Sequence, residues 1–209
     1  LQMSVGDIYR ERFSDTPSAM EAYQEALHYG SFSKAPLLQL LQIFSEQSEF
    51  DEATTVLDRL IELEDEDEKV ARWAWTAAVM CRDELHDETR TIHYLNKVLD
   101  HDIQNLEAFR SIDETLTAQR AWKPLEQNYR KMLSRVQKAG NNVENRGALL
   151  YTIYKNLGEI YRSRLQNDEY AISAFELAAQ ERPQDVRIRE ILAELYEADD
   201  NALDKAVHQ

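Results

Sequence analysis

The sequence predicts an all-α protein built from a repeated pair of antiparallel helices. Of its 209 residues only 5 are Gly and 4 are Pro, whereas Ala, Leu, Glu, Gln and Arg, which lose least on entering a helix, are abundant. A segment near the start of the chain recurs near its end, and apolar residues recur at i, i+3, i+4 and i+7 between short polar turns. These observations together indicate repeated helical hairpins.

The recurring segment covers residues 5–27 and 157–179, which align without a gap. Eight positions are identical in the two copies, and Gly and Tyr are among them. The matched pairs are Gly6 and Gly158, Ile8 and Ile160, Tyr9 and Tyr161, Arg10 and Arg162, Arg12 and Arg164, Ala19 and Ala171, Ala22 and Ala174, and Ala26 and Ala178. So many identities in so short a segment indicate an internal repeat.

Weaker copies between these two segments bring the number of repeats to five. The second helix of each repeat is marked by one small or apolar residue, and we call these five the anchor positions: Ala19, Ala53, Thr91, Leu125 and Ala171. They predict repeats at residues 1–31, 34–65, 68–103, 105–139 and 147–183. Residues 184–209 form a partial sixth repeat in which a helix over 185–197 caps the fifth pair and a short helix follows over 202–208.

Small residues and turn formers agree with this division. Gly6, Ala78 and Gly158 are predicted to let the two helices of a pair approach closely. The prolines at 17, 36 and 124 fall in expected first turns, where a missing N–H costs nothing, and the proline at 183 falls between repeats. Gly30 and Gly140 follow expected helix ends, where a left-handed residue is predicted.

The fifth repeat resembles the tetratricopeptide-repeat (TPR) superfamily, whose pattern is W-x2-L-G-x2-Y, then A-x3-F, then P. The matching residues are Tyr154, Leu157, Gly158, Tyr161, Ala171, Phe175 and Pro183, with Tyr in place of Trp and one extra residue between Tyr161 and Ala171. The resemblance covers nearly the whole chain. It implies a single right-handed α-solenoid over residues 1–209, in which the first helices line a concave groove that holds a peptide or protein.

Charge narrows the classes of partner. Lys and Arg number 24 against 39 Asp and Glu, which gives a net charge of −15 and disfavours nucleic acid as a partner. No stretch is apolar enough to insert into a membrane. Since the chain begins inside a helical pattern, we expect it to be a piece of a longer protein; its compartment stays open, with the cytoplasm as the default.

Signatures of catalysis and cofactor binding are absent from the sequence. It contains no P-loop, dinucleotide-binding, zinc-protease or serine-hydrolase motif, so we predict no enzyme activity, no cofactor and no metal. His86, His93 and His101 are too irregularly spaced for a shared metal and are predicted to lie on the surface. The acidic run over residues 62–68 is predicted to be a solvated turn, and Cys81, the only cysteine, to be a packing residue.

The TPR resemblance also implies a set of groove residues. In such folds the residue after the key Tyr of the first helix faces the groove, and three of the six such positions hold an arginine: Arg10, Arg82 and Arg162, beside Ser45, Thr117 and Glu197. Other groove positions add Arg72, Trp75, Arg110, Lys155 and Arg187. An arginine side chain can bind a carboxylate through two hydrogen bonds, so these residues favour a partner that presents an acidic segment or a C-terminal carboxylate. The alternative is that each Arg pairs with a neighbouring Glu or Asp and binds nothing.

The function that the sequence predicts is therefore a scaffold for protein–protein interaction. One rival is a structural subunit that joins a larger assembly through its edges or convex faces. Apolar residues at the N-terminal end, such as Leu1 and Met3, favour this rival. Another rival is a regulatory segment of a larger enzyme. The sequence leaves the partner's identity and the oligomeric state open.

Overall fold

The computed structural model describes residues 2–30 and 33–198, in which every regular element is a helix. The prediction of an all-α chain of helix pairs is confirmed. Helix contacts group the chain into two compact units, Leu1–Asp102 and Ile103–Gln209. That all repeats continue as one right-handed solenoid stays a prediction.

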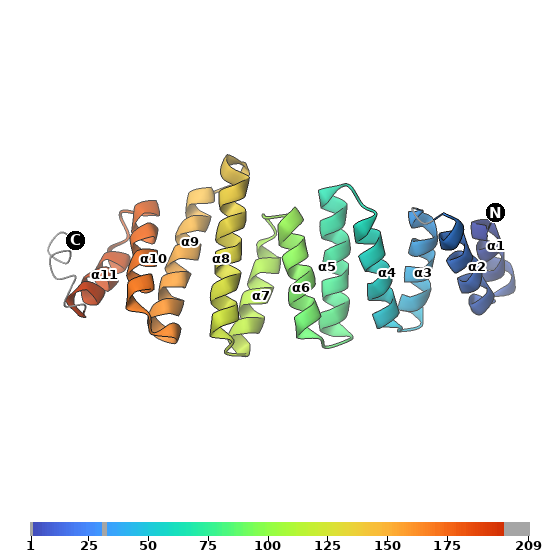
Figure 1. Ribbon diagram of the computed structural model, residues 1–209, viewed down its shortest axis with the longest axis horizontal. Coiled ribbons are helices and arrows are strands. Elements are labelled where there is room, and N and C mark those ends of the chain that lie inside the picture. Colours follow the sequence, from blue (N-terminus) through green and yellow to red (C-terminus); the bar gives the residue numbers. More distant parts are fainter. Residues whose placement is uncertain (1, 31–32, 199–209) are drawn as a thin grey trace. The chain divides into compact units, whose positions relative to one another are not determined.

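The first unit contains three helical hairpins (Figure 1). They pair α1 (Gln2–Ile8), continued by the π-helical turn η1 (Tyr9–Phe13), with α2 (Thr16–Tyr29); α3 (Lys34–Glu46) with α4 (Phe50–Glu62); and α5 (Asp67–Asp83) with α6 (Glu88–His101). Successive hairpins pack through α2 against α3 and α4 against α5. This unit thus buries its apolar stripes between neighbours rather than around one centre.

The second unit contains two hairpins and a further helix. They pair α7 (Leu106–Ala118) with α8 (Trp122–Ala139), and α9 (Arg146–Ile160), continued by the π-helical turn η3 (Tyr161–Leu165), with α10 (Asp168–Glu181). A 3-10 turn, η2 (Gly140–Asn142), follows α8, and α11 (Val186–Ala198) packs on α10 as expected of the capping helix. The short helix predicted over residues 202–208 lies outside the described residues.

Each hairpin reverses its direction through one residue in the left-handed conformation. These residues are Ser14, Ser48, His86, Arg120 and Gln166, each lying five positions before an anchor position, with φ between 50° and 58°. The backbone therefore repeats in the register that the anchor positions predict. Gly140 has the positive φ expected of a glycine at a helix end (58°), although its ψ of −127° is not that of the left-handed helical conformation. The prediction for Gly30 is wrong, since its φ is −140°. The N–H of Gly30 instead continues the helical bonding of α2 by donating to the carbonyl oxygen of Ala26.

The turns of the first, third and fifth hairpins are one residue wider than those of the second and fourth. There the N–H groups of Asp15, Asp87 and Asn167 each donate to the carbonyl oxygen six residues earlier, at 2.9–3.0 Å. In the second and fourth hairpins the corresponding bond reaches back only five residues. The side chains of these Asp and Asn residues also cap α2, α6 and α10 by accepting an N–H three residues on.

Close packing within a hairpin depends on a small residue facing an aromatic ring. A Cβ atom on Gly6 would lie 2.4 Å from the ring of Tyr23, and one on Gly158 would lie 2.7 Å from the ring of Phe175. Ala78 is buried in the third hairpin. The predicted role of these small residues is thus confirmed at both glycines, because no larger side chain fits under the ring.

Tyrosine hydroxyls donate hydrogen bonds to carboxylates of neighbouring helices throughout the chain. The pairs are Tyr23 with Asp7 (2.9 Å), Tyr94 with Asp58 (3.0 Å), Tyr161 with Glu126 (2.5 Å), Tyr196 with Glu176 (2.6 Å), Tyr151 with Asp185, and Tyr129 with Asp113. Burial, reinforced by the adjacent carboxylate, raises the pKa of Tyr23 and of Tyr161 to about 12. The phenols therefore stay protonated, and each holds a carboxylate of a neighbouring helix or turn close to its own helix.

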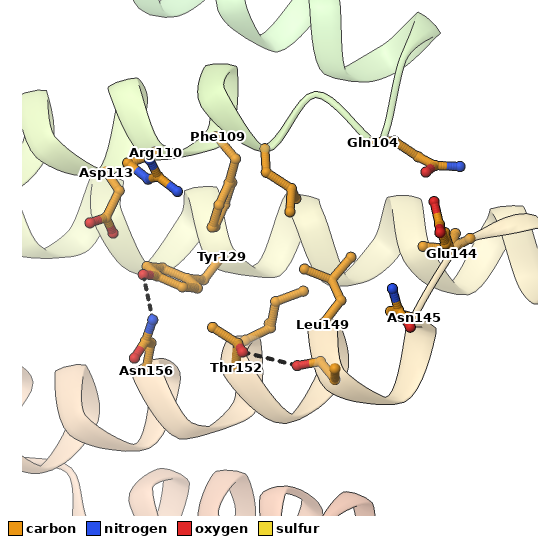
Figure 2. Close-up of a pocket in the computed structure, with 14 residues that line it drawn as sticks. Gln104, Phe109, Arg110, Asp113, Tyr129, Glu144, Asn145, Leu149, Thr152 and Asn156 are labelled. Carbon is orange, nitrogen blue, oxygen red and sulfur yellow. Dashed lines mark hydrogen bonds between the residues drawn. The ribbon is translucent and has the colours of Figure 1, made fainter.

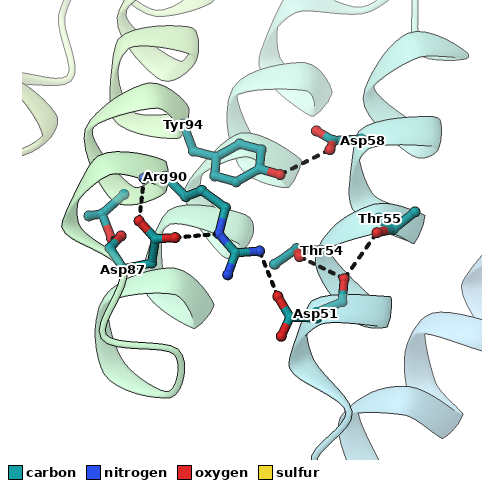
Figure 3. A network of polar contacts seen from close by, with 8 residues as sticks. Asp51, Thr54, Thr55, Asp58, Asp87, Arg90 and Tyr94 are labelled. Atoms are coloured by element: carbon teal, nitrogen blue, oxygen red, sulfur yellow. Dashed lines mark hydrogen bonds and ion pairs between the residues drawn. The ribbon is translucent and has the colours of Figure 1, made fainter.

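An arginine joins one such pair into a network in the first unit (Figure 3). Arg90 on α6 bonds Asp87 of its own helix and Asp51 of α4, both at 2.7 Å, beside the Tyr94–Asp58 bond. Hydrogen bonds from the backbone and side chain of Arg90 lower the pKa of Asp87. The network connects the second helices of consecutive hairpins, α4 and α6. Cys81 of α5 is buried, as expected of a packing residue, and this burial raises the pKa of its thiol.

Replacing Gly158 with Ala tests the close approach of α9 and α10. The added methyl group meets the Phe175 ring, and we expect the free energy of unfolding to fall by about 1–3 kcal/mol. Urea denaturation followed by circular dichroism measures this. Gly147→Ala is the control in the same helix, because its Cβ would contact only the flexible end of Glu181. Equal stability of the two variants would contradict the packing argument.

Raising the pH tests the tyrosine–carboxylate bonds. Because the folded state holds the pKa of Tyr23 near 12 against about 10 in the unfolded chain, its contribution to stability is full below pH 10 and is lost between pH 10 and 12. We expect Tyr23→Phe to be less stable at pH 7 by about 1–2 kcal/mol and to lose stability less steeply in alkali. Melting temperatures from pH 8 to 12 measure both effects, with the exposed Tyr29→Phe as control.

Candidate functional site

A cavity of about 560 Å³ opens between α7, α8 and α9 of the second unit (Figure 2). Its walls come from the two first helices of consecutive hairpins, α7 and α9, and from the segment that follows η2. The lining residues are Gln104, Leu106, Phe109, Arg110, Asp113, Tyr129, Val143, Glu144, Asn145, Ala148, Leu149, Thr152, Ile153 and Asn156. A cavity with apolar walls and a few polar groups is the usual form of a binding site.

The base of the cavity is held by Tyr129 of α8. Its ring meets Phe109 edge to face, with centroids 5.1 Å apart and planes at 87°. Its hydroxyl donates to Asp113 and accepts a hydrogen bond of 2.9 Å from the amide of Asn156. Burial above all, and then the bond to Asp113, raises the pKa of Tyr129, so the hydroxyl stays neutral and fixes both neighbours.

Polar groups at the rim keep hydrogen-bonding capacity. The guanidinium of Arg110 is exposed and makes no ion pair within residues 2–30 and 33–198. Asn156 uses one N–H on Tyr129, and Asn145 makes no capping bond at the start of α9. Charge-assisted and amide hydrogen bonds are therefore available beside apolar surface from Phe109 and Leu149.

The structure places the other predicted groove residues of the second unit outside this cavity. Arg162 pairs with Glu159 of its own helix at 3.2 Å and with Glu194 of α11 at 3.8 Å. Lys155 lies 5.9 Å from the ring centroid of Tyr151. Arg187 is exposed at the start of α11. The cavity therefore gathers one predicted residue, Arg110.

In the first unit Arg10 is held by its own chain. It donates to both carboxylate oxygens of Glu46 and to the side chains of Gln39 and Gln42, and its side chain is only 20% exposed. Arg82 pairs with Asp83 at 2.7 Å. Arg10 thus reaches an acid on the following hairpin and Arg162 an acid on the following helix, α11, which is the pairing that the alternative interpretation expects.

Arg72 and Trp75 lie on α5 of the first unit, Arg72 exposed and Trp75 half-buried. The three clustered histidines have separate surroundings: His86 contacts the carbonyl oxygen of Arg82, His93 the ring of Tyr94, and His101 the carboxylate of Asp67. Within the described part of the chain no three His, Cys, Asp or Glu residues come together as metal ligands. No helix described by the structure is both long and apolar enough to cross a bilayer.

Sequence reasoning missed most of the cavity, including Phe109, Tyr129 and Asn156. The signal that could have found it is the spacing of the anchor positions, since Leu125 and Ala171 are separated by more residues than any other consecutive pair. The additional residues extend α8, form η2 and supply Val143, Glu144 and Asn145 to the wall of the cavity.

Comparison with solved structures finds matches that cover most of this chain, with the three described below all at TM-scores under 0.5. The MamA protein is 17% identical with a TM-score of 0.42, covering 89% of this chain and 92% of its own. YrrB, described as a TPR protein with an unusual peptide-binding site, is 12% identical with a TM-score of 0.40, covering 91% and 89%. A tetratricopeptide repeat protein from Parabacteroides merdae is 16% identical with a TM-score of 0.41, covering 93% and 82%.

The matching solved structures include proteins described as TPR proteins. No family model matches the chain, and no curated protein matches it. The fold of the chain follows from its own helices and turns.

Replacing Tyr129 with Phe tests the bonds at the base of the cavity. The change removes one oxygen and leaves Asp113 and Asn156 without their shared partner, so we expect the free energy of unfolding to fall by about 1–3 kcal/mol. Urea denaturation measures the loss. Tyr154→Phe on the adjacent helix is the matched control, since its hydroxyl bonds no group in the described residues. A control as damaging as the test variant would refute this account.

Proposed function

We propose that the chain is a scaffold for protein–protein interaction, without enzymatic activity, that binds a peptide segment of its partner along the first helices of its hairpins. The observation that carries this proposal is the cavity between α7 and α9, which combines the apolar side chains of Phe109 and Leu149 with the cation of Arg110. A peptide meets both requirements with one apolar side chain and one carboxylate near it.

The partner we expect presents a single carboxylate rather than a long acidic run. The chain carries a net charge of −15, so a strongly acidic segment is repelled before it arrives. Asp113 and Glu144 also lie in the cavity wall, which limits the positive potential to the neighbourhood of Arg110. One carboxylate beside an apolar anchor is the charge that this surface fits best.

The remaining predicted groove residues differ in how readily a partner can bind them. Arg72 and Arg187 are exposed and in no ion pair of the described residues, so a longer partner can reach them without breaking a bond. Lys155 and Trp75 are half-buried. Arg10, Arg82 and Arg162 have acidic neighbours, and a partner's carboxylate must displace these to bind.

A peptide library displayed on phage and selected on the full chain tests this function. We expect enriched sequences to share an apolar residue close to a carboxylate. Their affinity, measured by isothermal titration calorimetry, is expected to fall about ten- to a hundredfold with Arg110→Ala, because a hydrogen bond to a charged group contributes about 1.5–3 kcal/mol. Ala148→Trp, which fills the cavity from an exposed position, is expected to abolish binding.

Lys123→Ala provides the matched control, since Lys123 is an exposed cation of α8 outside the cavity. It should bind the selected peptides as the parent does. Selected peptides that bind Ala148→Trp and the parent equally would place the binding surface elsewhere, and a library without any enriched sequence would argue against a peptide-binding scaffold.

A further inference from the structure

Three cations of the second unit gather around the ring of Tyr151, a buried residue of α9. The guanidinium of Arg182, which directly follows α10, lies 4.2 Å from the centre of this ring, and the ammonium group of Lys155 lies 5.9 Å from it. The pKa of Tyr151 is raised, first by its bond to Asp185. Arg182 and Arg187 oppose that rise, which places both guanidinium groups near the hydroxyl. We call Lys155, Arg182 and Arg187 the basic cluster.

The carboxylate that lies among these cations is already occupied. Asp185 accepts a hydrogen bond from the hydroxyl of Tyr151. It also accepts the backbone N–H groups of Arg187 at 3.0 Å and Ile188 at 3.4 Å, and so caps the start of α11. Asp185 is therefore held by neutral donors and leaves the positive charge of the basic cluster largely uncompensated.

No other acid of the described residues neutralises the basic cluster. Its three side chains form no ion pair within residues 2–30 and 33–198, although Glu181 and Glu190 are near them in sequence. Three positive charges thus stand against the one negative charge of Asp185, an excess of two in a chain whose net charge is −15. Arg182 and Arg187 are exposed and Lys155 is half-buried, so a ligand can reach all three.

The repeat itself does not require these cations. The first, third and fifth repeats align without a gap from the first helix to the start of the next hairpin, and α2, α6 and α10 end at matching positions. The residues that correspond to the basic cluster are Met3, Gly30 and Ala35 in the first repeat and Trp75, Asp102 and Glu107 in the third. Hairpins of the same length therefore form with no cation at any of these positions.

The excess charge matches a phosphate group. A phosphate carried on a side chain has a charge of about −1.5 to −2 at neutral pH, whereas a carboxylate has a charge of −1 and would leave part of the excess unpaired. A guanidinium donates two hydrogen bonds to phosphate oxygens, and an ammonium group adds a point charge. Arg187 also lies in the first turn of α11, where the helix dipole disfavours a cation and attracts an anion.

We propose that the basic cluster binds the phosphate group of a phosphorylated side chain in a partner peptide. Arg182 and Arg187 donate to the phosphate oxygens, and Lys155 adds the third charge. The proposal rests on the proposed function only in that a partner's peptide carries the phosphate, because the basic cluster shares no residue with the cavity between α7 and α9. Nucleic acid is a poorer occupant, since a chain of net charge −15 repels a polyanion beyond this small cluster.

Phosphoserine blocked as its N-acetyl N-methylamide is the first probe, titrated into the full chain and followed by nuclear magnetic resonance. We expect a dissociation constant of about 1 mM, because the ligand gains a few charge-assisted bonds at a solvent-exposed site. Glutamate blocked in the same way is the carboxylate counterpart and is expected to bind at least about tenfold more weakly, since it carries about half the charge. A library of peptides with a fixed phosphoserine and random flanks is expected to yield tighter ligands that lose binding on dephosphorylation.

Single substitutions test the three cations. Lys155→Gln, Arg182→Gln and Arg187→Gln are each expected to weaken binding of the blocked phosphoserine about three- to tenfold, because each removes one charged donor. Arg189→Gln is the matched control, since Arg189 is an exposed cation of the same helix as Arg187 and lies outside the basic cluster. It should bind as the parent does, and so should Arg110→Ala in the cavity. Circular dichroism verifies that each variant is folded.

Four outcomes would overturn the proposal. Blocked glutamate binds as tightly as blocked phosphoserine, or Arg189→Gln weakens binding as much as Arg187→Gln, which would show that only the overall charge matters. Inorganic phosphate binds more tightly than every phosphopeptide, which would make the ligand a free anion. A single-stranded oligonucleotide binds the basic cluster more tightly than the phosphopeptides, which would make the partner a nucleic acid. Failure of the unphosphorylated phage library on the cavity would leave all of these results unchanged.

Discussion

The contact on which the rest of the structure depends is the close approach of two helices in each hairpin. Gly6 and Gly158 lie under the rings of Tyr23 and Phe175 with no room for a side chain between them. This distance brings the buried faces of the two helices together, so each hairpin is a unit that exposes an apolar stripe only to the next one. In the second unit this packing holds α9, which forms one wall of the cavity, against α10.

An acidic chain has to place many carboxylates near helix contacts, and this one does so with tyrosines. A phenol contributes an apolar ring to the contact and a donor to the acid at its edge, without the cost of burying a second charge. Tyr94 and Asp58 connect α6 to α4, and Tyr161 and Glu126 connect η3 to α8. The bonds join consecutive hairpins, so stability spreads along each unit through neighbours.

Pairing with acids inside the chain also decides which cations are available to a partner. Arg10, Arg90 and Arg162 are bound to acids of neighbouring helices and serve the packing of hairpins. Arg110 lies at the cavity in the second unit and forms no ion pair with an acid among the described residues. The cavity therefore calls for a peptide with one carboxylate.

The sequence by itself determined the helical hairpins, their register and the small residues between helices, because these follow from local periodicity, turn chemistry and the recurrence of one segment. It also placed Cys81 in the core. Only the tertiary structure decided which charged side chains pair, since Arg10 meets Glu46 and Arg162 meets Glu194 through helices that are distant in sequence. The cavity around Phe109, Tyr129 and Asn156 likewise required three helices and the segment after η2 to be in place, and no spacing along one helix encodes it.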